Sequence, residues 1–266
     1  MPEGDTVFHT AHRLHEALAG RTLTSGEIRH PRLAAVTFAG RTVTEVVPAG
    51  KHLFVRFDDE RSLHSHLRMD GSWHLYAPGE RWRMPGHHAR VVLTAPDREA
   101  VGFRLHDLDL VPRTREGAYV DRLGPDLLAP EWTPRHQAEA ERRLAARPDG
   151  AFGVALLDQT VVAGIGNVYM NEVCFLVGTS PHTPTAGVPG DVRAEAIATA
   201  RKLLWDNRFR IARTTTGSTA PGDRHWVYGR TRRPCRRCGT PIATRPLGRE
   251  PEARTSWFCP RCQPAP

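Results

Sequence analysis

The sequence of 266 residues predicts an α+β fold divided into several domains. Three observations predict this class. A single helical pattern is followed by a series of short β-rich runs. A second group of helical patterns follows a stretch that contains several prolines, and two C-x2-C pairs stand near the end. We therefore expect an N-terminal helix with a β-sandwich or barrel, then a helical domain, then a small metal-stabilised module.

Composition indicates a polyanionic partner and a reducing compartment. The formal net charge is +8, and Lys51 and Lys202 are the only lysines, so arginine supplies nearly all of the positive charge. The planar guanidinium group matches phosphate oxygens well, which favours nucleic acid, although GC-rich coding also enriches arginine. Four of the five cysteines form C-x2-C pairs, which suits a metal site in the cytoplasm better than disulfides. No signal peptide and no apolar run long enough to span a bilayer is present, so we expect no membrane association.

The first five residues, Met-Pro-Glu-Gly-Asp, offer a nucleophile and an acid side by side. Removal of Met1 would leave Pro2 as a free secondary amine, with a pKa of about 8 in the unperturbed state. Such an amine attacks an aldehyde carbon and gives an iminium directly. Glu3 is suited to proton transfer to and from the same centre. The alternative is an ordinary frayed terminus, because short motifs have many chance matches.

Residues 6–19 predict an amphipathic helix that holds Pro2 at its start and stops at Gly20. Its apolar face consists of Val7, Ala11, Leu14 and Leu18. Short alternating or β-rich runs follow, separated by Pro, Gly and Asp turns, which is typical of a sandwich or barrel. These expected strands are residues 22–29, 42–47, 52–57, 62–68, 72–77, 89–95 and 100–106.

Two residues at the predicted strand ends are candidate ligand contacts. Lys51 follows Gly50 at the entry to the 52–57 strand, and it is either a phosphate contact or a solvated strand end. Met69 precedes Asp70 and Gly71 in a turn. A flexible apolar side chain there is either core filler or a wedge of the kind that DNA-kinking proteins insert between bases.

Prolines between residues 121 and 134 indicate an interdomain linker, and four helices are expected after it, over residues 134–146, 151–158, 167–176 and 191–207. Thr133 can cap the first of these, with Pro134 at its first position. The turn Gly164-Ile165-Gly166-Asn167 leads into a helix N-terminus, where free N–H groups and the Asn167 amide suit a phosphate. The alternative is a helix–turn–helix corner whose glycines allow close packing.

The C-terminal region carries the strongest local signal. Residues 213–224 are polar and rich in glycine, which predicts a mobile loop. After it, four cysteines in the pattern C-x2-C-x20-C-x2-C predict one closed, structural zinc site that folds a β-hairpin; they are Cys235, Cys238, Cys259 and Cys262. Arg245, Arg249 and Arg254 lie in this hairpin and are either solvated charges or nucleic-acid contacts, while Cys174 is interpreted as a buried thiol.

Taken together, these motifs resemble the Fpg/Nei family of bifunctional DNA glycosylases, from Pro2 to Gln263. Five motifs stand in the family's order: Pro-Glu-Gly, Ala-Gly-Lys51, His-Leu-Arg-Met69-Asp-Gly, Gln159 with Gly-Ile-Gly-Asn167, and the four-cysteine ribbon ending Cys-Pro-Arg-Cys-Gln263. The resemblance implies a β-sandwich behind the N-terminal helix, a helix–two-turns–helix domain and a zinc finger. We place their boundaries at residues 1–122, 123–224 and 225–266.

The resemblance also implies roles for matching residues. Pro2 is expected to be the Schiff-base nucleophile, Glu3 the general acid and Lys51 a contact to the phosphate beside the lesion. Asn167 and Arg254 are expected to hold phosphates around the flipped nucleotide, and Met69 to enter the gap that this nucleotide leaves. The implied partner is damaged double-stranded DNA, with single-stranded or bubble DNA as alternatives. The chain is expected to act as a monomer in the bacterial cytoplasm, in association with the nucleoid.

Two departures bear on the substrate. Family members specific for oxidised purines carry a long loop before the zinc finger, and residues 213–224 are short for that. They also carry an Arg and a Phe that probe the opposite base, whereas the corresponding stretch, 105–110, has neither. Both features favour the endonuclease VIII-like branch and oxidised pyrimidines, while Met69 resembles the purine branch. Two other classes remain open: a non-catalytic damage-binding protein, and a zinc-ribbon RNA-binding factor.

Overall fold

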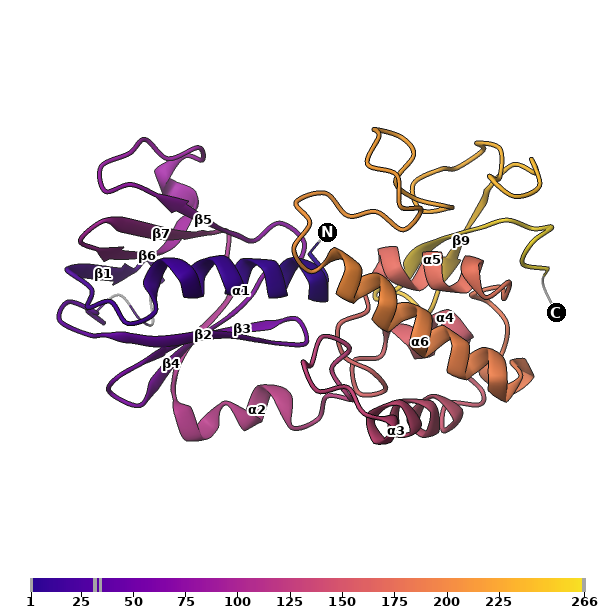
Figure 1. Cartoon of the computed structure of the whole chain (residues 1–266), viewed down its shortest axis with the longest axis horizontal. Coiled ribbons are helices and arrows are strands. Elements are labelled where there is room, and N and C mark those ends of the chain that lie inside the picture. Colours follow the sequence, from indigo (N-terminus) through magenta and orange to yellow (C-terminus); the bar gives the residue numbers. More distant parts are fainter. Residues whose placement is uncertain (1, 31–32, 34, 265–266) are drawn as a thin grey trace. The chain divides into compact units, whose positions relative to one another are not determined.

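The computed structural model describes residues 2–30, 33 and 35–264, so Met1 and the question of its removal lie outside the described residues. The chain divides into two compact units, Met1–Arg122 and Leu123–Pro266. Figure 1 shows the first unit from indigo to magenta and the second from magenta to yellow. Among the described residues, none of the helices is both long and apolar enough to cross a membrane.

The first unit consists of helix α1, two four-stranded antiparallel sheets and a short helix α2, Gly117–Val120. One sheet has the order β1-β6-β7-β5 and the other β2-β3-β4-β8. The bounds of the elements are α1 Gly4–Leu18, β1 Ser25–Ile28, β2 Val43–Ala49, β3 His52–Phe57, β4 Arg61–His66, β5 Ser72–Tyr76, β6 Ala89–Ala95, β7 Arg98–Phe103 and β8 Asp107–Pro112.

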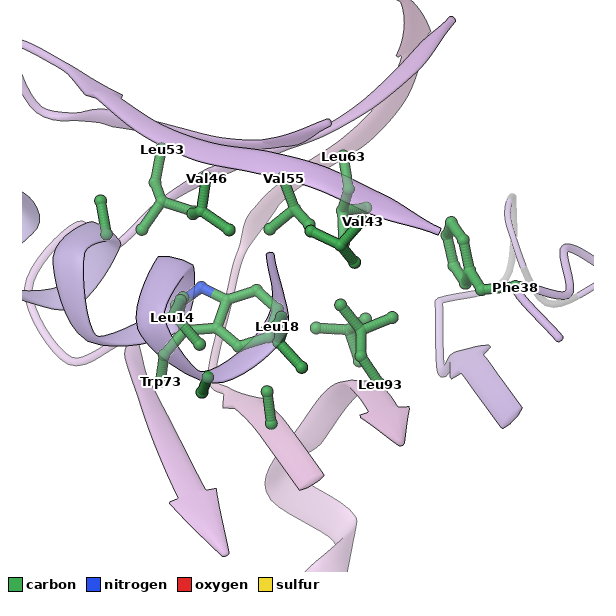
Figure 2. Packing of buried hydrophobic residues seen from close by; sticks show 14 of the residues in the cluster. Leu14, Leu18, Phe38, Val43, Val46, Leu53, Val55, Leu63, Trp73 and Leu93 are labelled. Carbon is green, nitrogen blue, oxygen red and sulfur yellow. The ribbon is translucent and has the colours of Figure 1, made fainter. Parts of the chain in front are cut away.

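Helix α1 packs against β2 and β3 of one sheet and against β5 and β7 of the other. Figure 2 shows Leu14 and Leu18 between Val46 and Leu53 on one side and Trp73 on the other. All four residues of the predicted apolar face are buried, which confirms the amphipathic helix. Removing such a side chain from a packed core costs about 2–5 kcal/mol, so this helix is a structural part of the sandwich rather than an attached segment.

The predicted strands are present, with shifted ends and one addition. Helix α1 starts at Gly4, two residues before the expected start, and β8, which is not among the predicted strands, occupies much of the 105–110 stretch. Strand β8 exists because it pairs with β4 along its whole length, with Leu110 opposite Leu63. This pairing joins residues that are far apart in sequence, and the mixed Asp-Leu pattern of the strand does not predict it.

Among its described residues, 123–264, the second unit contains four α-helices: α3 Pro134–Ala145, α4 Phe152–Leu157, α5 Asn167–Leu176 and α6 Gly190–Asn207. As expected, Thr133 is the N-cap of α3 and Pro134 its first residue; the main-chain N–H of Thr133 donates to His136 Nδ1 at 3.1 Å. Helix α5 packs against α4 and α6, and nine of its ten residues are buried. The two turns between α4 and α5 thus connect helices of the domain core.

The C-terminal region folds as the predicted hairpin. Strands β9, Ala243–Leu247, and β10, Arg254–Phe258, pair antiparallel, and β10 also packs against α5. Residues 213–224 form bends and turns without a helix or strand. The fold is therefore α+β: an N-terminal helix with a β-sandwich, a helical domain with two turns between α4 and α5, and a hairpin that carries the four cysteines.

Candidate functional site

In the first unit, the N-terminal segment places a carboxyl group at the start of a buried helix. Pro2 is half-buried, and Glu3 is fully buried at the N-cap position of α1 with an extended backbone, φ −131° and ψ −173°. The main-chain N–H of Val7 donates to the Glu3 carbonyl at 3.0 Å, which closes the first helical turn. The helix N-terminus has a partial positive charge, which favours an anion close to Pro2.

Lys51 lies in the two-residue turn of the β2–β3 hairpin. Ala49 pairs with His52, and Gly50 adopts a positive φ of 57°, which two-residue hairpin turns require at this position and which glycine adopts without strain. Two hydrogen bonds orient β2 along α1: the main-chain N–H of Gly20 donates to Val43 O at 2.8 Å, and the main-chain N–H of Val46 donates to the His15 side chain at Nδ1, at 3.2 Å. Helix and strand therefore run in opposite directions, so the β2–β3 turn, which contains Lys51, lies toward the start of α1. Figure 1 shows α1 alongside β2 and β3.

Met69 projects from the turn between β4 and β5. Its side chain is 56% exposed, which excludes the core-filler alternative. The turn closes with a hydrogen bond from Gly71 N–H to Leu67 O at 2.8 Å, and a Cβ atom on Gly71 would lie 2.6 Å from that same oxygen. His66, at the end of β4, pairs with His52, so this turn and the Lys51 turn lie at the same end of the sheet. The structure thus brings the N-terminus, Lys51 and Met69 to one end of the first unit.

A second turn braces the one that carries Met69. Asp70 faces both Arg104, at 3.8 Å, and His106, at 3.4 Å, in the β7–β8 connection. Arg68, with a left-handed φ of 49°, forms an ion pair with Asp107. These contacts cross-link the two turns, and they present several cationic side chains beside the exposed Met69.

The sequence reasoning missed a histidine cluster on the outer face of β3 and β4. His52 Nδ1 lies 2.8 Å from His64 Nε2, and the His64 ring stacks on Tyr119, with 3.9 Å between ring centroids. A cavity of about 440 Å³ is lined by this cluster together with His106, Asp107 and neighbouring residues. The alternating pattern His64-Ser65-His66 is the only local signal of it, since His52 comes from another strand.

Burial holds these imidazoles in their neutral form. The pKa of His64 is lowered to about 3 and that of His66 to about 4, mainly by burial and in addition by the neighbouring His52. Burial likewise lowers the pKa of His52, while Asp107 opposes that shift. At neutral pH these three histidines therefore add no positive charge beside Lys51 and the arginines.

In the second unit, a glutamine side chain shapes the turn that precedes α5. Gln159 Nε2 donates to the carbonyls of Leu157, at 2.8 Å, and Ile165, at 3.0 Å, and its Oε1 accepts the Gly164 N–H at 3.1 Å. Gly164 has a φ of 108°, which only glycine adopts readily. These three hydrogen bonds hold the loop that delivers Asn167 to the first position of α5.

The structure brings Asn167 to Thr255, the residue that follows Arg254. Asn167 Nδ2 donates to the main-chain carbonyl of Thr255 at 3.0 Å, and the neighbouring Arg254 is exposed. The sequence reasoning also missed Asn171 and Glu172, one turn further along α5 and fully buried. Buried polar side chains in an otherwise apolar helix were the available signal, because such groups need hydrogen-bond partners.

The four cysteines form a cluster that fits a tetrahedral metal ion. All four Sγ atoms lie within 4.8 Å of one another. The separations are 3.9 Å for Cys235–Cys262, 3.4 Å for Cys238–Cys259 and 3.5 Å for Cys238–Cys262. Four Zn–S bonds of about 2.3 Å would place sulfurs about 3.8 Å apart, and a disulfide would place them about 2 Å apart. The donor set and its spacing therefore fit one zinc ion.

Comparisons with known proteins match the chain to one protein family over its full length. Residues 1–108 match the formamidopyrimidine-DNA glycosylase N-terminal domain, and residues 123–207 match the formamidopyrimidine-DNA glycosylase H2TH domain. The probable endonuclease 8 2 of Streptomyces coelicolor is 49% identical, over 100% of this chain and 95% of the relative. The DNA-(apurinic or apyrimidinic site) lyase Nei2 of Mycolicibacterium smegmatis is 46% identical over the full length of both chains.

Solved structures share the fold at lower identity. Lactococcus lactis formamidopyrimidine-DNA glycosylase bound to DNA with an abasic site has a TM-score of 0.81, with 23% identity over 99% of this chain and 100% of that one. The same L. lactis protein has also been solved with DNA that contains an oxidised pyrimidine, with a TM-score of 0.80, 24% identity and the same coverage. From its relatives and its domain matches together, the chain belongs to the Fpg/Nei family of DNA glycosylases and abasic-site lyases, and it is similar over its full length to the actinobacterial endonuclease 8 2 proteins.

Proposed function

We propose that this protein removes oxidised pyrimidines from duplex DNA and cuts the strand at the resulting abasic site, with Pro2 as the nucleophile. The observation that carries the proposal is the full-length similarity to endonuclease 8 2 proteins in a chain that begins Met-Pro-Glu. The position of Pro2 and Glu3 at the start of a buried helix, at the same end of the unit as Lys51 and Met69, supports it.

The proposed reaction begins after removal of Met1, which frees the Pro2 nitrogen. A damaged base leaves the stack, at a cost of a few kcal/mol that the lesion lowers. The Pro2 nitrogen attacks C1′ of the sugar, the bond from C1′ to the base breaks, and the base departs with that electron pair and a proton. Glu3 donates a proton to the sugar ring oxygen as the ring opens, which leaves an iminium between Pro2 and C1′.

The iminium then drives strand cleavage. It accepts electrons when C2′ loses a proton, and the bond from C3′ to the phosphate oxygen breaks in a β-elimination. A second elimination at the 5′ side, with Glu3 moving protons, releases the other phosphate. Addition of water to the C1′ of the remaining iminium releases the sugar fragment as an aldehyde, returns the free amine of Pro2 and completes the cycle.

The remaining predicted residues have binding roles in this proposal. Lys51 binds the phosphate beside the lesion, and Asn167 and Arg254 bind phosphates around the flipped nucleotide. Met69 fills the gap that the nucleotide leaves, which its exposure on a braced turn supports. Residues 123–224 and 225–266 act as the helical and zinc-finger domains. Zinc held by the four cysteines would keep the hairpin folded, and a closed shell of four thiolates gives it a structural role.

Two candidate substrates remain, and each has an observation behind it. Oxidised pyrimidines are favoured because stretch 105–110 lacks the Arg and Phe of the purine branch and residues 213–224 are short for a capping loop. Oxidised purines are the second candidate, because Met69 resembles the wedge of that branch. The two candidates predict different single-turnover rates. A protein specific for oxidised pyrimidines cuts a duplex with an oxidised pyrimidine faster, and a protein specific for oxidised purines cuts a duplex with an oxidised purine faster.

Borohydride trapping tests the proposal directly. Protein from which Met1 has been removed is incubated with a duplex that carries one abasic site or one oxidised pyrimidine. Borohydride then reduces the iminium to a stable adduct. We expect a covalent protein–DNA adduct, with peptide mapping that places the link at Pro2. The matched control is the same chain with an N-terminal extension, in which the Pro2 nitrogen forms a peptide bond and cannot react. Binding without any adduct by protein whose Pro2 is shown to be free would favour the non-catalytic alternative.

A further inference from the structure

Two asparagine side chains of α5 form hydrogen bonds with the edge of strand β10 that faces away from β9. Asn167 Nδ2 donates to the Thr255 carbonyl at 3.0 Å, and the Trp257 N–H donates to Asn171 Oδ1 at 2.6 Å. Residues two apart in a strand direct their main-chain groups to the same side, so Thr255 and Trp257 both face the helix. The asparagines thus supply the donor and acceptor that a further strand would otherwise provide.

The spacing of the helix matches the spacing of the strand. Asn167 and Asn171 are four residues apart, a rise of about 6 Å on one face of an α-helix. Thr255 and Trp257 are two residues apart, about 6.8 Å along a strand. This match lets two side chains of one helix bind two main-chain groups of one strand edge, and a shift of the hairpin by one residue would lose both hydrogen bonds.

Asn171 also determines the orientation of the Asn167 amide. Because Asn171 Oδ1 accepts the Trp257 N–H, Asn171 Nδ2 points toward Asn167, where it donates to the main-chain carbonyl at 2.6 Å and to Oδ1 at 3.3 Å. Asn167 Oδ1 therefore faces Asn171, and Asn167 Nδ2 faces Thr255. An amide nitrogen carries two N–H groups, and the bond to Thr255 uses one of them.

The edge of β10 that faces α5 receives its hydrogen bonds from the helix rather than from β9. Thr255 stands opposite Pro246, and because the main-chain groups of Thr255 face the helix, the missing N–H of Pro246 costs the hairpin no hydrogen bond. Arg254, one residue earlier, begins β10 and is exposed. Its position therefore depends on how β10 docks on α5, and this docking runs through Asn167 and the fully buried Asn171.

We propose that Asn171 is a positioning residue for DNA binding, which orients the Asn167 amide and docks β10 so that Asn167 and Arg254 reach phosphates of the same DNA strand together. The inference rests on the proposed function, in which Asn167 and Arg254 bind phosphates, and it adds a residue that has no contact with DNA itself.

The first test is Asn171→Leu. This variant keeps the side-chain volume and removes the relay, by which we mean the hydrogen bonds of the Asn171 amide to Asn167 and Trp257. We expect the Kd for a duplex with a stable abasic-site analogue to rise about 10-fold, the effect of losing one hydrogen bond to a charged group. Zinc content and the circular dichroism spectrum stay those of the wild type. The loss is non-additive with Arg254→Ala, because the relay acts through that residue.

Asn207→Leu is the matched control. Asn207 is also a buried asparagine on a helix of the second unit, and it bonds the carbonyls of Leu203 and Thr214, both at 2.8 Å, without touching β10. We expect any effect of this variant on the Kd to add to that of Arg254→Ala. If Asn171→Leu binds like the wild type, or if its loss adds to that of Arg254→Ala as the control's does, the positioning role is overturned.

Asn171→Asp supplies a pH-dependent rescue that a purely structural role does not predict. Its ionised carboxylate accepts from Trp257 but has no proton for the Asn167 oxygens, and burial against those oxygens raises its pKa. When protonated, it has the shape and the donor of asparagine. We expect the ratio of its Kd to the wild-type Kd to be about 10 at pH 8 and to approach 1 as the pH falls toward 5.5. A ratio that does not change with pH would contradict the relay.

The wild-type arm separates the two proposals. If the wild type neither binds the abasic duplex nor gives a borohydride adduct, the proposed function fails and the inference fails with it. If the wild type does both and Asn171→Leu matches it, the inference alone is overturned.

Discussion

Single buried polar residues connect the segments of this protein. Glu172 is fully buried on α5, and its carboxylate accepts the main-chain N–H groups of Trp226, Val227 and Tyr228 at 2.7, 2.9 and 2.8 Å. The Thr215 hydroxyl donates to the same carboxylate. A buried carboxylate needs this number of donors to offset its desolvation. Asn171 and Glu172, adjacent in sequence, thus anchor the hairpin and the segment that leads into it.

At the same scale, the histidine cluster predicts how stability depends on pH. An unfolded chain binds protons at its histidines below pH of about 6.5, whereas folded His64 and His66 stay neutral down to about 3 and about 4. Their contribution to stability is therefore complete above about pH 6.5 and is lost as the pH falls toward these values. Each such group adds a slope of at most about 1.4 kcal/mol per pH unit.

His64→Phe tests this expectation by removing one such group. We expect its free energy of unfolding, measured by denaturant titration from pH 7 to 4.5, to fall less steeply than that of the wild type, whatever its absolute value. His106→Phe is the control, because the His106 side chain is 60% exposed. Parallel curves for His64→Phe and the wild type would mean that His64 takes up a proton in the folded protein.

At the scale of elements, we propose that a metal ion bound by the four cysteines stabilises the hairpin, whereas α1 depends on its apolar face. Helix α1 buries its own stripe of side chains against both sheets, so the sandwich core maintains it. Strands β9 and β10 pair over five residues each, which is too little to be stable alone. Around the four cysteines, a small apolar cluster that includes Phe175, Val227 and Ile242 completes the hairpin's packing.

Cys259→Ser should therefore unfold the hairpin while α1 and the sandwich remain. Loss of one thiolate opens the tetrahedral site and removes the folding energy that zinc provides. We expect loss of bound zinc in elemental analysis, faster proteolysis within residues 235–262, and much weaker duplex binding. Cys174→Ala is the control, since Cys174 is buried in α5 and is not one of the four clustered cysteines, so this variant should keep its zinc. Unchanged duplex affinity in Cys259→Ser would contradict the proposal that the metal has a structural role in the hairpin.

At the scale of the whole molecule, the net charge of +8 implies strong, salt-dependent attraction to DNA. Arg254→Ala should weaken binding equally for all duplex sequences and make the slope of log K against log salt shallower by about 0.9, the effect of one lost phosphate contact. Fluorescence anisotropy across a salt series measures this slope. Arg249→Ala is the matched variant, since Arg249 is also exposed on the hairpin. An equal change in both would show general surface charge rather than a specific contact.

The sequence by itself determined the features whose signals are local. Helix α1 follows from the period of its apolar residues, the α3 cap from Thr133 and Pro134, and the metal cluster from the spacing of four cysteines. The order of five short motifs was enough to indicate the family that the comparisons show. These signals are readable because each depends on residues close together along the chain.

Only the tertiary structure decided the features that join distant residues. Strand β8 exists through its pairing with β4, the His52–His64 contact through the register of β3 and β4, and the Asn171–Trp257 hydrogen bond through docking of the hairpin on α5. In each case a polar or ambiguous residue is stabilised by a partner that the local sequence does not specify. Hydrophobic periodicity predicts which face of an element is buried, but the partner of a buried polar group depends on which elements meet.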